Sequence, residues 1–437
     1  MTDPIVAPAT AWGRSPLAVV RLTGSGLDPI LAAVLTGSQR LQETPRRVGI
    51  RSANGTPIDD GLAWLRRGPR TATGQDLCEI TVHGNPLIVE ALVQACLSAG
   101  ARTARPGEFT RRAVLGGHLD LVRAEAVDQV IRATSPGGLD LARTGMDGRL
   151  SRRLQEWHEA LLASAADLEA RLDYPDDELT LASDDELIRG LWAVSVACAA
   201  LAETYDAGRA LVDGVRIALV GPVNAGKSSL FNRLVGSERA LVHAQPGTTR
   251  DVVEARCQLG PLQATLLDTA GERSTEDPVE AAGLALAQRL VADTDLLVVV
   301  LRAGRPTAAD PVILARTAAQ RRVVVYNGLD QARGVPDGAL GTSAVTGEGL
   351  DALQDAIVAQ LGVADTSELL VASARQRDAL QAISAAAQEA VTALPVAGPA
   401  VAADALTRGL EQLDVLTGAD TREEVLDALF ARFCIGK

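Results

Sequence analysis

Aromatic residues are scarce in this chain of 437 residues, at 3% of the sequence. Its hydrophobic cores must therefore be built from Leu, Val, Ile and Ala, which supply most of the 47% of apolar residues. Positive charge is also in deficit, because the net charge is −13. That balance excludes a protein that coats nucleic acid by bulk electrostatics, although it leaves room for a local basic groove or for RNA held by a partner.

Cysteine and long apolar runs are equally sparse. None of the 5 cysteines lies in a C-x-x-C pair or at metal-ligand spacing from a histidine, so we expect buried or free thiols in a reducing compartment. The sequence does not open on a basic-then-apolar leader. Apolar runs such as Leu296 to Leu301 are far shorter than the ~20 residues of a membrane helix. We expect a cytoplasmic protein with no membrane segment.

The first half of the chain changes character near residue 117. Residues 1–117 alternate in strand fashion around a helical stretch from Leu87 to Ala99, which predicts a compact α+β domain. Residues 118–211 are rich in Ala, Leu, Glu and Arg and predict long helices, with a break at Tyr174 to Asp177. They form the first part of a helical domain.

The second half changes character twice. Residues 212–364 alternate short apolar strands with helical segments, as an α/β sheet with crossover helices does. Residues 365–437 are helical again, with breaks expected at Pro395 and Pro399 and a capping box at Thr421 to Glu424. One buried face is expected on the last helix, at Val425, Leu426, Leu429, Phe430 and Phe433. We therefore predict an α/β domain inserted into a discontinuous helical domain whose two parts pack together.

The segment Gly221-Pro-Val-Asn-Ala-Gly-Lys-Ser228 matches the phosphate-loop pattern G-x-x-x-x-G-K-[ST]. It lies between an apolar strand, Arg216 to Val220, and a helical run, Ser229 to Leu234, which is the context that the pattern requires. Its backbone amides and the helix N-terminus face an anion, Lys227 reaches the β and γ phosphates, and the Ser228 hydroxyl binds Mg²⁺. The expected nucleotide-binding residues here are Asn224, Ala225, Gly226, Lys227, Ser228 and Ser229.

Further segments follow in the order that a GTPase requires. Gly247-Thr-Thr-Arg-Asp251 places Thr249 to complete the Mg²⁺ shell over the γ phosphate. In Asp268-Thr-Ala-Gly271, Asp268 would hold Mg²⁺ through water and the Gly271 amide would sense the γ phosphate. Such segments order and collapse with the nucleotide state. The expected nucleotide-binding residues are His243, Gly247, Thr248, Thr249, Asp268, Thr269, Ala270 and Gly271, with Thr249 and Lys227 also in catalytic roles.

Base selection is expected at Asn327-Gly-Leu-Asp330. An Asp carboxylate accepts from N1–H and the 2-amino group of guanine, a polar match that discriminates against adenine by roughly 10⁴-fold. The usual form of the motif is N-K-x-D, and Gly328 replaces a Lys that lies along the base and braces the phosphate loop, so lower guanine affinity is expected. Thr342-Ser-Ala-Val345 would place an amide near guanine O6. The expected base-site residues are Asn327, Asp330, Ser343, Ala344 and Val345.

Two alternatives stay open on these residues. One is a phosphate-loop ATPase, which nucleotide competition would distinguish. The other is a guanine-nucleotide switch with negligible hydrolysis, which a turnover assay would distinguish.

Segments outside the nucleotide motifs add a more specific signal. They are Arg105-Pro-Gly-Glu-Phe-Thr-Arg-Arg-Ala113, Gly117-His-Leu-Asp-Leu121, Ala124-Glu-Ala126 and Phe433-Cys-Ile-Gly-Lys437. With them the chain resembles, over essentially its whole length, the MnmE (TrmE) family of tRNA modification GTPases. The resemblance implies a homodimer formed through the N-terminal domain, which binds a tetrahydrofolate derivative. It also implies a flavoprotein partner, MnmG, and addition of a carboxymethylaminomethyl or aminomethyl group to carbon 5 of the wobble uridine of tRNA.

The resemblance also implies K⁺-activated hydrolysis. Asn224 resembles the family's K⁺ ligand, and the loop carrying His243, Gln245 and Thr248 would close the K⁺ site. A K⁺ ion there would occupy the position of an arginine finger, whose contribution to rate is ~10³–10⁵. Glu280 matches the spacing of the family's water-positioning glutamate, with Glu272 as the alternative.

Arg21, Glu79 and Lys437 match family positions for folate. A basic side chain suits the glutamate tail of folate, and a carboxylate suits the donor face of the pterin. Taken from the sequence alone, a surface or paired charge is the favoured interpretation of each, and their candidacy for folate rests mostly on the resemblance. His118 stands where the family commonly has Lys and is a weaker partner for a carboxylate. For Cys434, an inert packing role and a direct role in chemistry both stay open.

An alternative function for the chain also stays open, namely a GTP-binding switch in ribosome assembly with an unrelated N-terminal extension.

Overall fold

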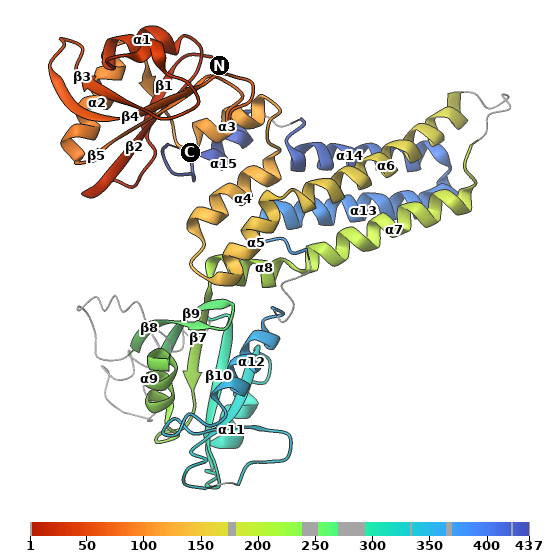
Figure 1. Ribbon diagram of the computed structural model, residues 1–437. Coiled ribbons are helices and arrows are strands. Elements are labelled where there is room, and N and C mark those ends of the chain that lie inside the picture. The colour runs from red at the N-terminus through yellow and green to blue at the C-terminus, as the bar shows by residue number, and fades with distance from the viewer. Residues whose placement is uncertain are drawn as a thin grey trace, which may run out of the picture. The chain divides into compact units, whose positions relative to one another are not determined.

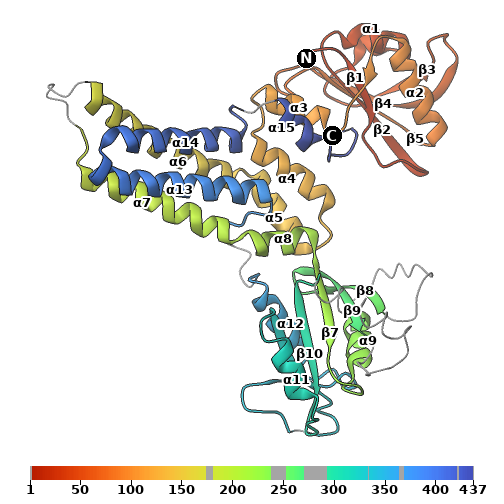
Figure 2. The same cartoon turned by 180° about the vertical axis from the view of Figure 1, so that it is seen from behind.

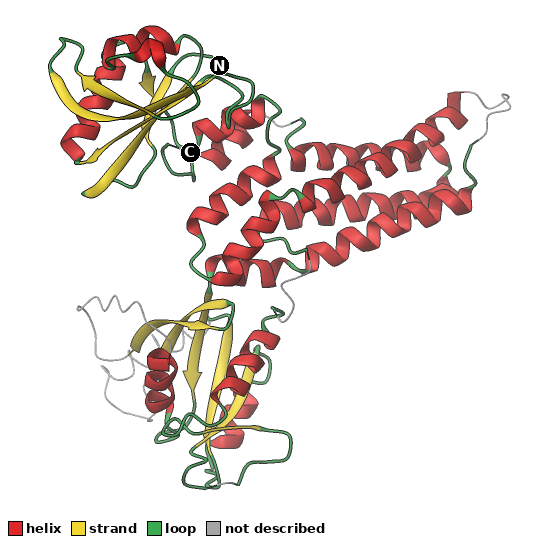
Figure 3. Cartoon of the chain, viewed as in Figure 1, coloured by secondary structure: helices red, strands yellow, loops and turns green. Residues whose placement is uncertain are grey.

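The computed structural model describes residues 2–173, 181–237, 252–269, 293–332, 334–363, 369–420 and 423–436. The chain divides into two compact units, of which unit 1 comprises Met1–Asp128 and Leu413–Lys437 and unit 2 comprises Gln129–Gln412. Figures 1 and 2 show the chain from opposite sides, and Figure 3 distinguishes its helices from its strands. The four segments expected from the sequence, with boundaries after residues 117, 211 and 364, remain predictions because this division is coarser.

Unit 1 is built on a six-stranded sheet in the order β3-β4-β5-β2-β1-β6. Its strands are β1 (Ile5–Pro8), β2 (Ser15–Thr23), β3 (Arg46–Arg51), β4 (Pro57–Arg66), β5 (Leu77–Gly84) and β6 (Arg102–Thr103). Its first helices are α1 (Leu27–Val34), the 3₁₀ turn η1 (Ser38–Arg40) and α2 (Pro86–Ser98). All neighbouring strands are antiparallel except β1 and β6. The expected α+β domain is therefore confirmed.

Helices α1 and α2 cover one face of this sheet. Every second residue of a strand faces these helices. Val20 and Ile80, for example, are buried in one cluster with Leu31 of α1 and Leu92 of α2. The helix expected from Leu87 to Ala99 is confirmed as α2, which begins where the Asn85 side chain accepts a hydrogen bond from the Leu87 amide.

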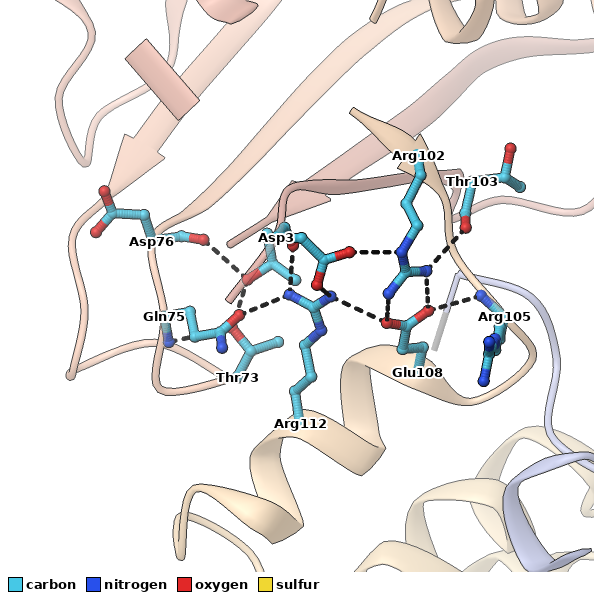
Figure 4. A network of polar contacts seen from close by, with 10 residues as sticks. Asp3, Thr73, Gln75, Asp76, Arg102, Thr103, Arg105, Glu108 and Arg112 are labelled. Carbon is cyan, nitrogen blue, oxygen red and sulfur yellow. Dashed lines mark hydrogen bonds and ion pairs between the residues drawn. The ribbon is translucent and has the colours of Figure 1, made fainter. Parts of the chain in front are cut away.

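The opposite face of the sheet meets α3 (Glu108–Leu115), which carries the motif that begins at Arg105. Glu108 starts the helix with its side chain only 4% exposed. Figure 4 shows its carboxylate between two arginines: Arg102 donates to Oε2 at 2.8 Å, and Arg112 donates to Oε1 at 3.0 Å. The Arg105 amide donates to Oε2 at 2.9 Å. The motif thus ties the start of α3 to the edge of the sheet.

Arg112 extends this network to the N-terminal strand. Its Nη1 donates to the Asp3 carbonyl at 2.8 Å and to Gln75 Oε1 at 2.9 Å (Figure 4). Its side chain is 1% exposed, so the charge is compensated by acceptors from three separate stretches of chain.

The helical part of the chain comprises α4 (Leu121–Arg132), α5 (Pro136–Met146), α6 (Arg149–Asp173), α7 (Asp184–Glu203), α8 (Tyr205–Asp213), α13 (Ala374–Ala397), α14 (Pro399–Thr417) and α15 (Glu423–Phe430). Of these, α15 lies in unit 1, α4 and α14 cross the division between the units, and the others lie in unit 2. In Figures 1 and 2, α6, α7, α13 and α14 lie side by side. Helix α6 ends at Asp173 and α7 begins at Asp184, and the break expected at Tyr174 to Asp177 lies outside the described residues.

The two parts of the helical domain pack together through α7 and α13. At the centre of this contact, Ser195 and Ser384 are buried and exchange hydrogen bonds: each hydroxyl donates to the other's carbonyl, at 3.0 and 2.9 Å. Satisfied polar pairs of this kind fix the register of helices that are otherwise apolar at their contact. The predicted insertion of an α/β domain into a discontinuous helical domain is therefore confirmed.

The expectation of a break at Pro395 is wrong. Helix α13 continues through Pro395 to Ala397, and Gly398, at a φ of 86°, ends it. Proline removes only one helical hydrogen bond, and here the loss falls in the final turn. Pro399 does begin a new helix, α14, where its fixed φ is suited to the first turn.

The buried face expected on the last helix is confirmed at Leu426 and Phe430 of α15, whereas Leu429 is partly buried, Phe433 is buried beyond the end of the helix, and the Val425 side chain lies outside the described residues. Leu426, Phe430 and Phe433 pack with Val114 and Leu121 in unit 1. The capping box at Thr421 to Glu424 lies outside the residues that are described in full.

One described stretch, Asp184–Asp213 through α7 and α8, is long and apolar enough to cross a membrane, with a mean hydropathy of 1.4 over its most apolar 18-residue window. A core helix passes the same test, and α7 lies against α13. Cysteine behaves as expected, because Cys78, Cys96, Cys198 and Cys257 are buried free thiols and Cys434 is an exposed one.

The inserted domain is a six-stranded sheet in the order β12-β11-β10-β7-β9-β8, parallel except for β8. Its elements are β7 (Val215–Val220), α9 (Lys227–Ser237), β8 (Val252–Leu259), β9 (Leu262–Thr269), β10 (Leu296–Arg302), α11 (Asp310–Arg316), β11 (Arg322–Asn327), β12 (Leu340–Thr342) and α12 (Leu350–Gln360). Helices α9 and α12 pack on one face, and α11 packs on the other. Helices on both faces explain why β10 is an uninterrupted apolar run.

We predict that Glu108→Gln destabilises the sheet edge of unit 1 by about 3 kcal/mol, because two arginines lose a charged acceptor in a buried site. Amide hydrogen exchange of β1 and α3 in the full chain measures the effect. Glu90→Gln, an exposed change on α2, is the matched control and should shift the opening free energy by less than about 0.5 kcal/mol. Equal protection in the two variants would contradict the prediction.

The same carboxylate predicts a pH dependence. Burial alone would raise the pKa of Glu108, but hydrogen bonds from Arg102, the Arg105 amide and Arg112 outweigh it and lower the pKa to about 2, from an ordinary 4.5. Its stabilising contribution is therefore complete above pH 4.5 and is lost as the pH falls toward 2. Exchange protection of β1 should fall across that window in the wild type more than in Glu108→Gln.

Candidate functional site

The carboxyl ends of the parallel strands bring the predicted nucleotide residues to one edge of the second sheet. The loop Gly221–Gly226 follows β7, Asp268 lies near the end of β9, and Asn327 ends β11. In α/β sheets this edge is where ligands bind. The expected nucleotide-binding residues within the described ranges therefore come together at this edge from separate segments of the chain.

The phosphate loop is closed by the lysine that follows it. Lys227 begins α9 and is 6% exposed, and its Nζ donates to the carbonyls of Gly221 at 2.9 Å and Pro222 at 3.0 Å. The loop keeps its curl partly through Asn224, a non-glycine residue with a φ of 63°. Asn is one of the few residues that adopt this left-handed conformation readily. Ser228 and Ser229 are exposed on the first turn of α9, beside the helix N-terminus that favours an anion.

Asn327 joins this loop to the segment after β12. Its Nδ2 lies 3.4 Å from the Ala225 carbonyl oxygen and 3.3 Å from that of Gly226, and its Oδ1 accepts from the Ala344 amide at 3.1 Å. Asn327 is 5% exposed, so these contacts satisfy a buried amide. In this structure Asn327 therefore positions the loops that would hold the nucleotide.

The base-recognition loop is held in the same way. Asp330 is exposed, and its Oδ1 accepts from the hydroxyl of Ser343, itself fully buried, at 2.6 Å. This hydrogen bond holds the pKa of Asp330 below its ordinary value, so the carboxylate is charged at neutral pH. Val345 is 71% exposed beside it. The arrangement suits a base that donates two hydrogen bonds, as guanine does.

The surroundings of Asp268 fit a cation bound nearby. It is the register partner of Leu219, two residues before the phosphate loop. Its Oδ1 is buried without a hydrogen-bond partner in the structure. A buried unpaired carboxylate oxygen is costly unless something compensates it, and a hydrated Mg²⁺ beside Ser228 would do so.

Part of the predicted site lies outside the described residues. This part comprises His243, Gln245, Gly247, Thr248, Thr249, Ala270, Gly271, Glu272, Glu280 and Lys437. Thr269 ends β9.

Sequence reasoning missed Arg302. It ends β10, is the register partner of Asn327, and donates from Nη1 to the Asn224 carbonyl at 3.0 Å. The available signal was a charged residue directly after the apolar run Leu296 to Leu301, at the sheet edge where ligands bind.

The folate candidates lie in unit 1, on the sheet face opposite α1 and α2. Cross-strand register aligns Arg21 of β2, Glu79 of β5 and Trp64 of β4. Arg21 Nε donates to Glu79 Oε1 at 2.8 Å, and its Nη1 donates to the Gly436 carbonyl at 3.1 Å. The guanidinium also lies 5.8 Å from the ring centre of Phe109. The structure therefore brings Arg21, Glu79 and the C-terminal motif together.

His118 is placed differently. Its exposed ring lies so close to Gly74 that a Cβ there would meet the ring at 2.1 Å. Within the described part of the chain, it makes no hydrogen bond or ion pair with Arg21 or Glu79. The backbone carbonyl of Cys434 accepts from the Gly107 amide at 3.3 Å, beside the start of α3.

Comparisons with known proteins cover the whole chain. Residues 121–434 match the family description "MnmE helical domain", and residues 4–118 match "GTP-binding protein TrmE N-terminus". The chain is 40% identical over 440 residues to the tRNA modification GTPase MnmE of Myxococcus xanthus (strain DK1622), with 99% of this chain and 98% of that protein covered. It is 39% identical over 456 residues to the protein of the same name from Synechococcus sp. (strain CC9605), with 100% and 99% covered.

Among solved structures, the G domain of the T. maritima FeoB iron transporter is similar to 33% of this chain. The match covers 98% of that domain, at 28% identity and a TM-score of 0.28.

We predict that Gly226→Ala weakens GDP binding at least roughly tenfold, because Gly226 has a φ of 90° and an added Cβ would lie 2.2 Å from Asn327 Nδ2. Titration with a fluorescent GDP analogue measures the loss. Gly236→Ala, in α9, is the matched control: its Cβ would meet nothing within 4 Å, and it should bind GDP as the wild type does. Equal affinity of the two variants would show that the loop tolerates the intrusion.

Proposed function

Because the chain belongs to the MnmE family of tRNA modification GTPases, we propose that it is a K⁺-activated GTP hydrolase that modifies the wobble uridine of tRNA with a flavoprotein partner. The observation that carries the GTP-binding part of the proposal is the position of Asn327 beside the phosphate loop. Asn327 connects the carbonyls of Ala225 and Gly226 to the Ala344 amide. One residue thereby sets the spacing between the site for the phosphates and the site for the base.

The nucleotide roles follow from this geometry. Asp330, kept charged by the Ser343 hydroxyl, accepts from N1–H and the 2-amino group of guanine. Lys227 exchanges its carbonyl partners for the β and γ phosphates when GTP binds. Bound Mg²⁺ supplies charge neutralisation on the phosphate oxygens, and Ser228, Asp268 and Thr249 are the residues that would hold it.

Potassium activation is proposed through Asn224. Its left-handed backbone turns its carbonyl toward Arg302, while the residue itself is exposed on the phosphate loop. We propose that its side-chain oxygen binds K⁺, with His243, Gln245 and Thr248 closing the site. The ion then supplies the positive charge that an arginine finger supplies in other GTPases.

We propose that Glu280 orients the attacking water, directly or through a second water. Glu272 is the alternative, and both lie outside the described residues.

The N-terminal domain is proposed to bind a tetrahydrofolate derivative that supplies the one-carbon unit, and to form the homodimer. Arg21, Glu79, His118 and Lys437 are the proposed contacts. The support is the half-buried Arg21–Glu79 pair, at 24% and 20% side-chain exposure, a cation and an anion side by side on the sheet face that packs against Phe109. Because the two side chains are in contact, they would face the same part of folate: Glu79 would accept from the donor face of the pterin, and Arg21 would donate to an acceptor beside it.

The partners and compartment follow from the same reaction. The proposed substrate is tRNA, the proposed partner is the flavoprotein MnmG, and the proposed product carries a carboxymethylaminomethyl or aminomethyl group on carbon 5 of the wobble uridine. We propose a cytoplasmic location, which a reaction on tRNA supports. The alternative of a ribosome-assembly switch is disfavoured, because its premise of an unrelated N-terminal extension conflicts with the family match over residues 4–118.

GTP turnover in KCl and in NaCl, with and without the flavoprotein, tests the proposal. We expect faster turnover in KCl, and loss of that stimulation in Asn224→Ala and in Asn224→Gly. The glycine variant tolerates a φ of 63°, so it separates loss of the amide from backbone strain. Asn232→Ala, exposed on α9, is the control and should keep the wild-type ratio. An unchanged KCl-to-NaCl ratio in Asn224→Gly would defeat the ligand role.

Calorimetric titration of a one-carbon tetrahydrofolate onto the full-length dimer tests the N-terminal site. We expect Arg21→Met to weaken binding at least roughly tenfold, because a charged partner of the ligand is lost. Arg47→Met removes an arginine whose side chain is 81% exposed on the same sheet and should bind as the wild type does. Equal affinities would exclude Arg21 from the folate site while leaving the GTPase proposal intact.

A further inference from the structure

The guanine motif of this chain lacks its cation. Gly328 occupies the position where N-K-x-D has Lys, and its φ is 101°, a conformation that costs any other residue strain. A Cβ at Gly328 would meet nothing within 4 Å, so space is not what excludes a side chain. The backbone conformation itself favours glycine, and the brace that a Lys would provide must come from elsewhere or be absent.

The guanidinium of Arg302 lies between the phosphate loop and the base-recognition loop. Arg302 extends from the end of β10, and because β10 and β11 are parallel neighbours, it lies beside Asn327, the first residue of the motif. One terminal nitrogen donates to the Asn224 carbonyl at 3.0 Å, and the other donates to Gln331 Oε1. Arg302 thus connects the phosphate loop with the residue that directly follows Asp330.

We propose that Arg302 is a positioning residue for the nucleotide, a brace between the phosphate loop and the base-recognition loop that replaces the missing motif Lys. The inference rests on the proposed guanine-nucleotide site. It goes beyond that site in assigning the brace to a residue outside the nucleotide motifs.

The physical basis is the conformation of Asn224. Asn adopts a φ of 63° more readily than other non-glycine residues, but the conformation is still less favoured than the right-handed one, so contacts that hold it help to set the shape of the loop. The charge-assisted hydrogen bond from Arg302 to the Asn224 carbonyl is such a contact. The second bond, to Gln331, fixes the guanidinium, so that movement of either loop is resisted by the other.

The Arg302 side chain is only partly buried, which makes its contribution testable without destroying the core. The brace acts on the bound complex. It should therefore slow nucleotide dissociation, whereas a long-range attraction for phosphate would act on association.

The test measures association and dissociation rates of a fluorescent GDP analogue for the wild type, Arg302→Ala, Arg302→Lys and Arg305→Ala. Arg305, exposed in the loop after β10, is the control for charge. We expect Arg302→Ala to dissociate roughly tenfold faster, with association within about twofold of the wild type. Arg302→Lys keeps a charged donor for the Asn224 carbonyl and should lie between the two, and Arg305→Ala should match the wild type.

Three results would overturn the inference. They are dissociation from Arg302→Ala at the wild-type rate, an equal loss in Arg302→Ala and Arg305→Ala, and no recovery in Arg302→Lys. If the wild type itself failed to bind GDP, the proposed function would fall, and that result is distinct from all three. The melting temperature of each nucleotide-free variant shows whether a loss reflects the brace or a general loss of folding.

Discussion

The nucleotide site depends on how a tight loop of backbone is held open at the edge of a parallel sheet. The loop Gly221–Gly226 directs its amides inward only if its carbonyls are occupied elsewhere. The structure occupies them with buried or partly buried donors: Lys227 on Gly221 and Pro222, Asn327 on Ala225 and Gly226, and Arg302 on Asn224. Of these three donors only Lys227 has to exchange carbonyls for phosphates when a polyphosphate binds, so the loop needs little reorganisation, which is the condition for strong electrostatic stabilisation.

Hydrogen bonds and close backbone contacts also link the nucleotide domain to the helices on either side of it in the sequence. Asp295, just before β10, accepts from Arg209 of α8 at 2.5 Å and from the Arg216 amide of β7 at 2.8 Å. Gly208 of α8 approaches the Val371 backbone so closely that a Cβ would lie 2.2 Å from its carbonyl oxygen. Both chain connections of the insertion therefore contact α8, one through charged groups and one through closely packed backbone.

The sequence predicts the parts of this protein that local pattern determines. Apolar runs locate β7 and β10, and a contiguous motif locates the phosphate loop with its lysine. What it does not provide is the partner of each polar side chain. Arg302 reaches Asn224 because β10 lies between β7 and β11 in the sheet, an order that the chain does not follow. The network around Glu108 has the same origin, since it joins Asp3, Gln75 and the segment from Arg102 to Arg112, three stretches that are distant in sequence.

Motif patterns describe positions along the chain, whereas the chemistry requires a charge at a place in space. In this chain, position 328 of the motif is a glycine with a positive φ, and the cation, Arg302, lies on the neighbouring strand instead. A gap in a motif therefore indicates lost function only if no other residue reaches the same acceptor. The relevant question for a departure such as Gly328 is which carbonyl loses its donor, and here the Asn224 carbonyl retains one from Arg302.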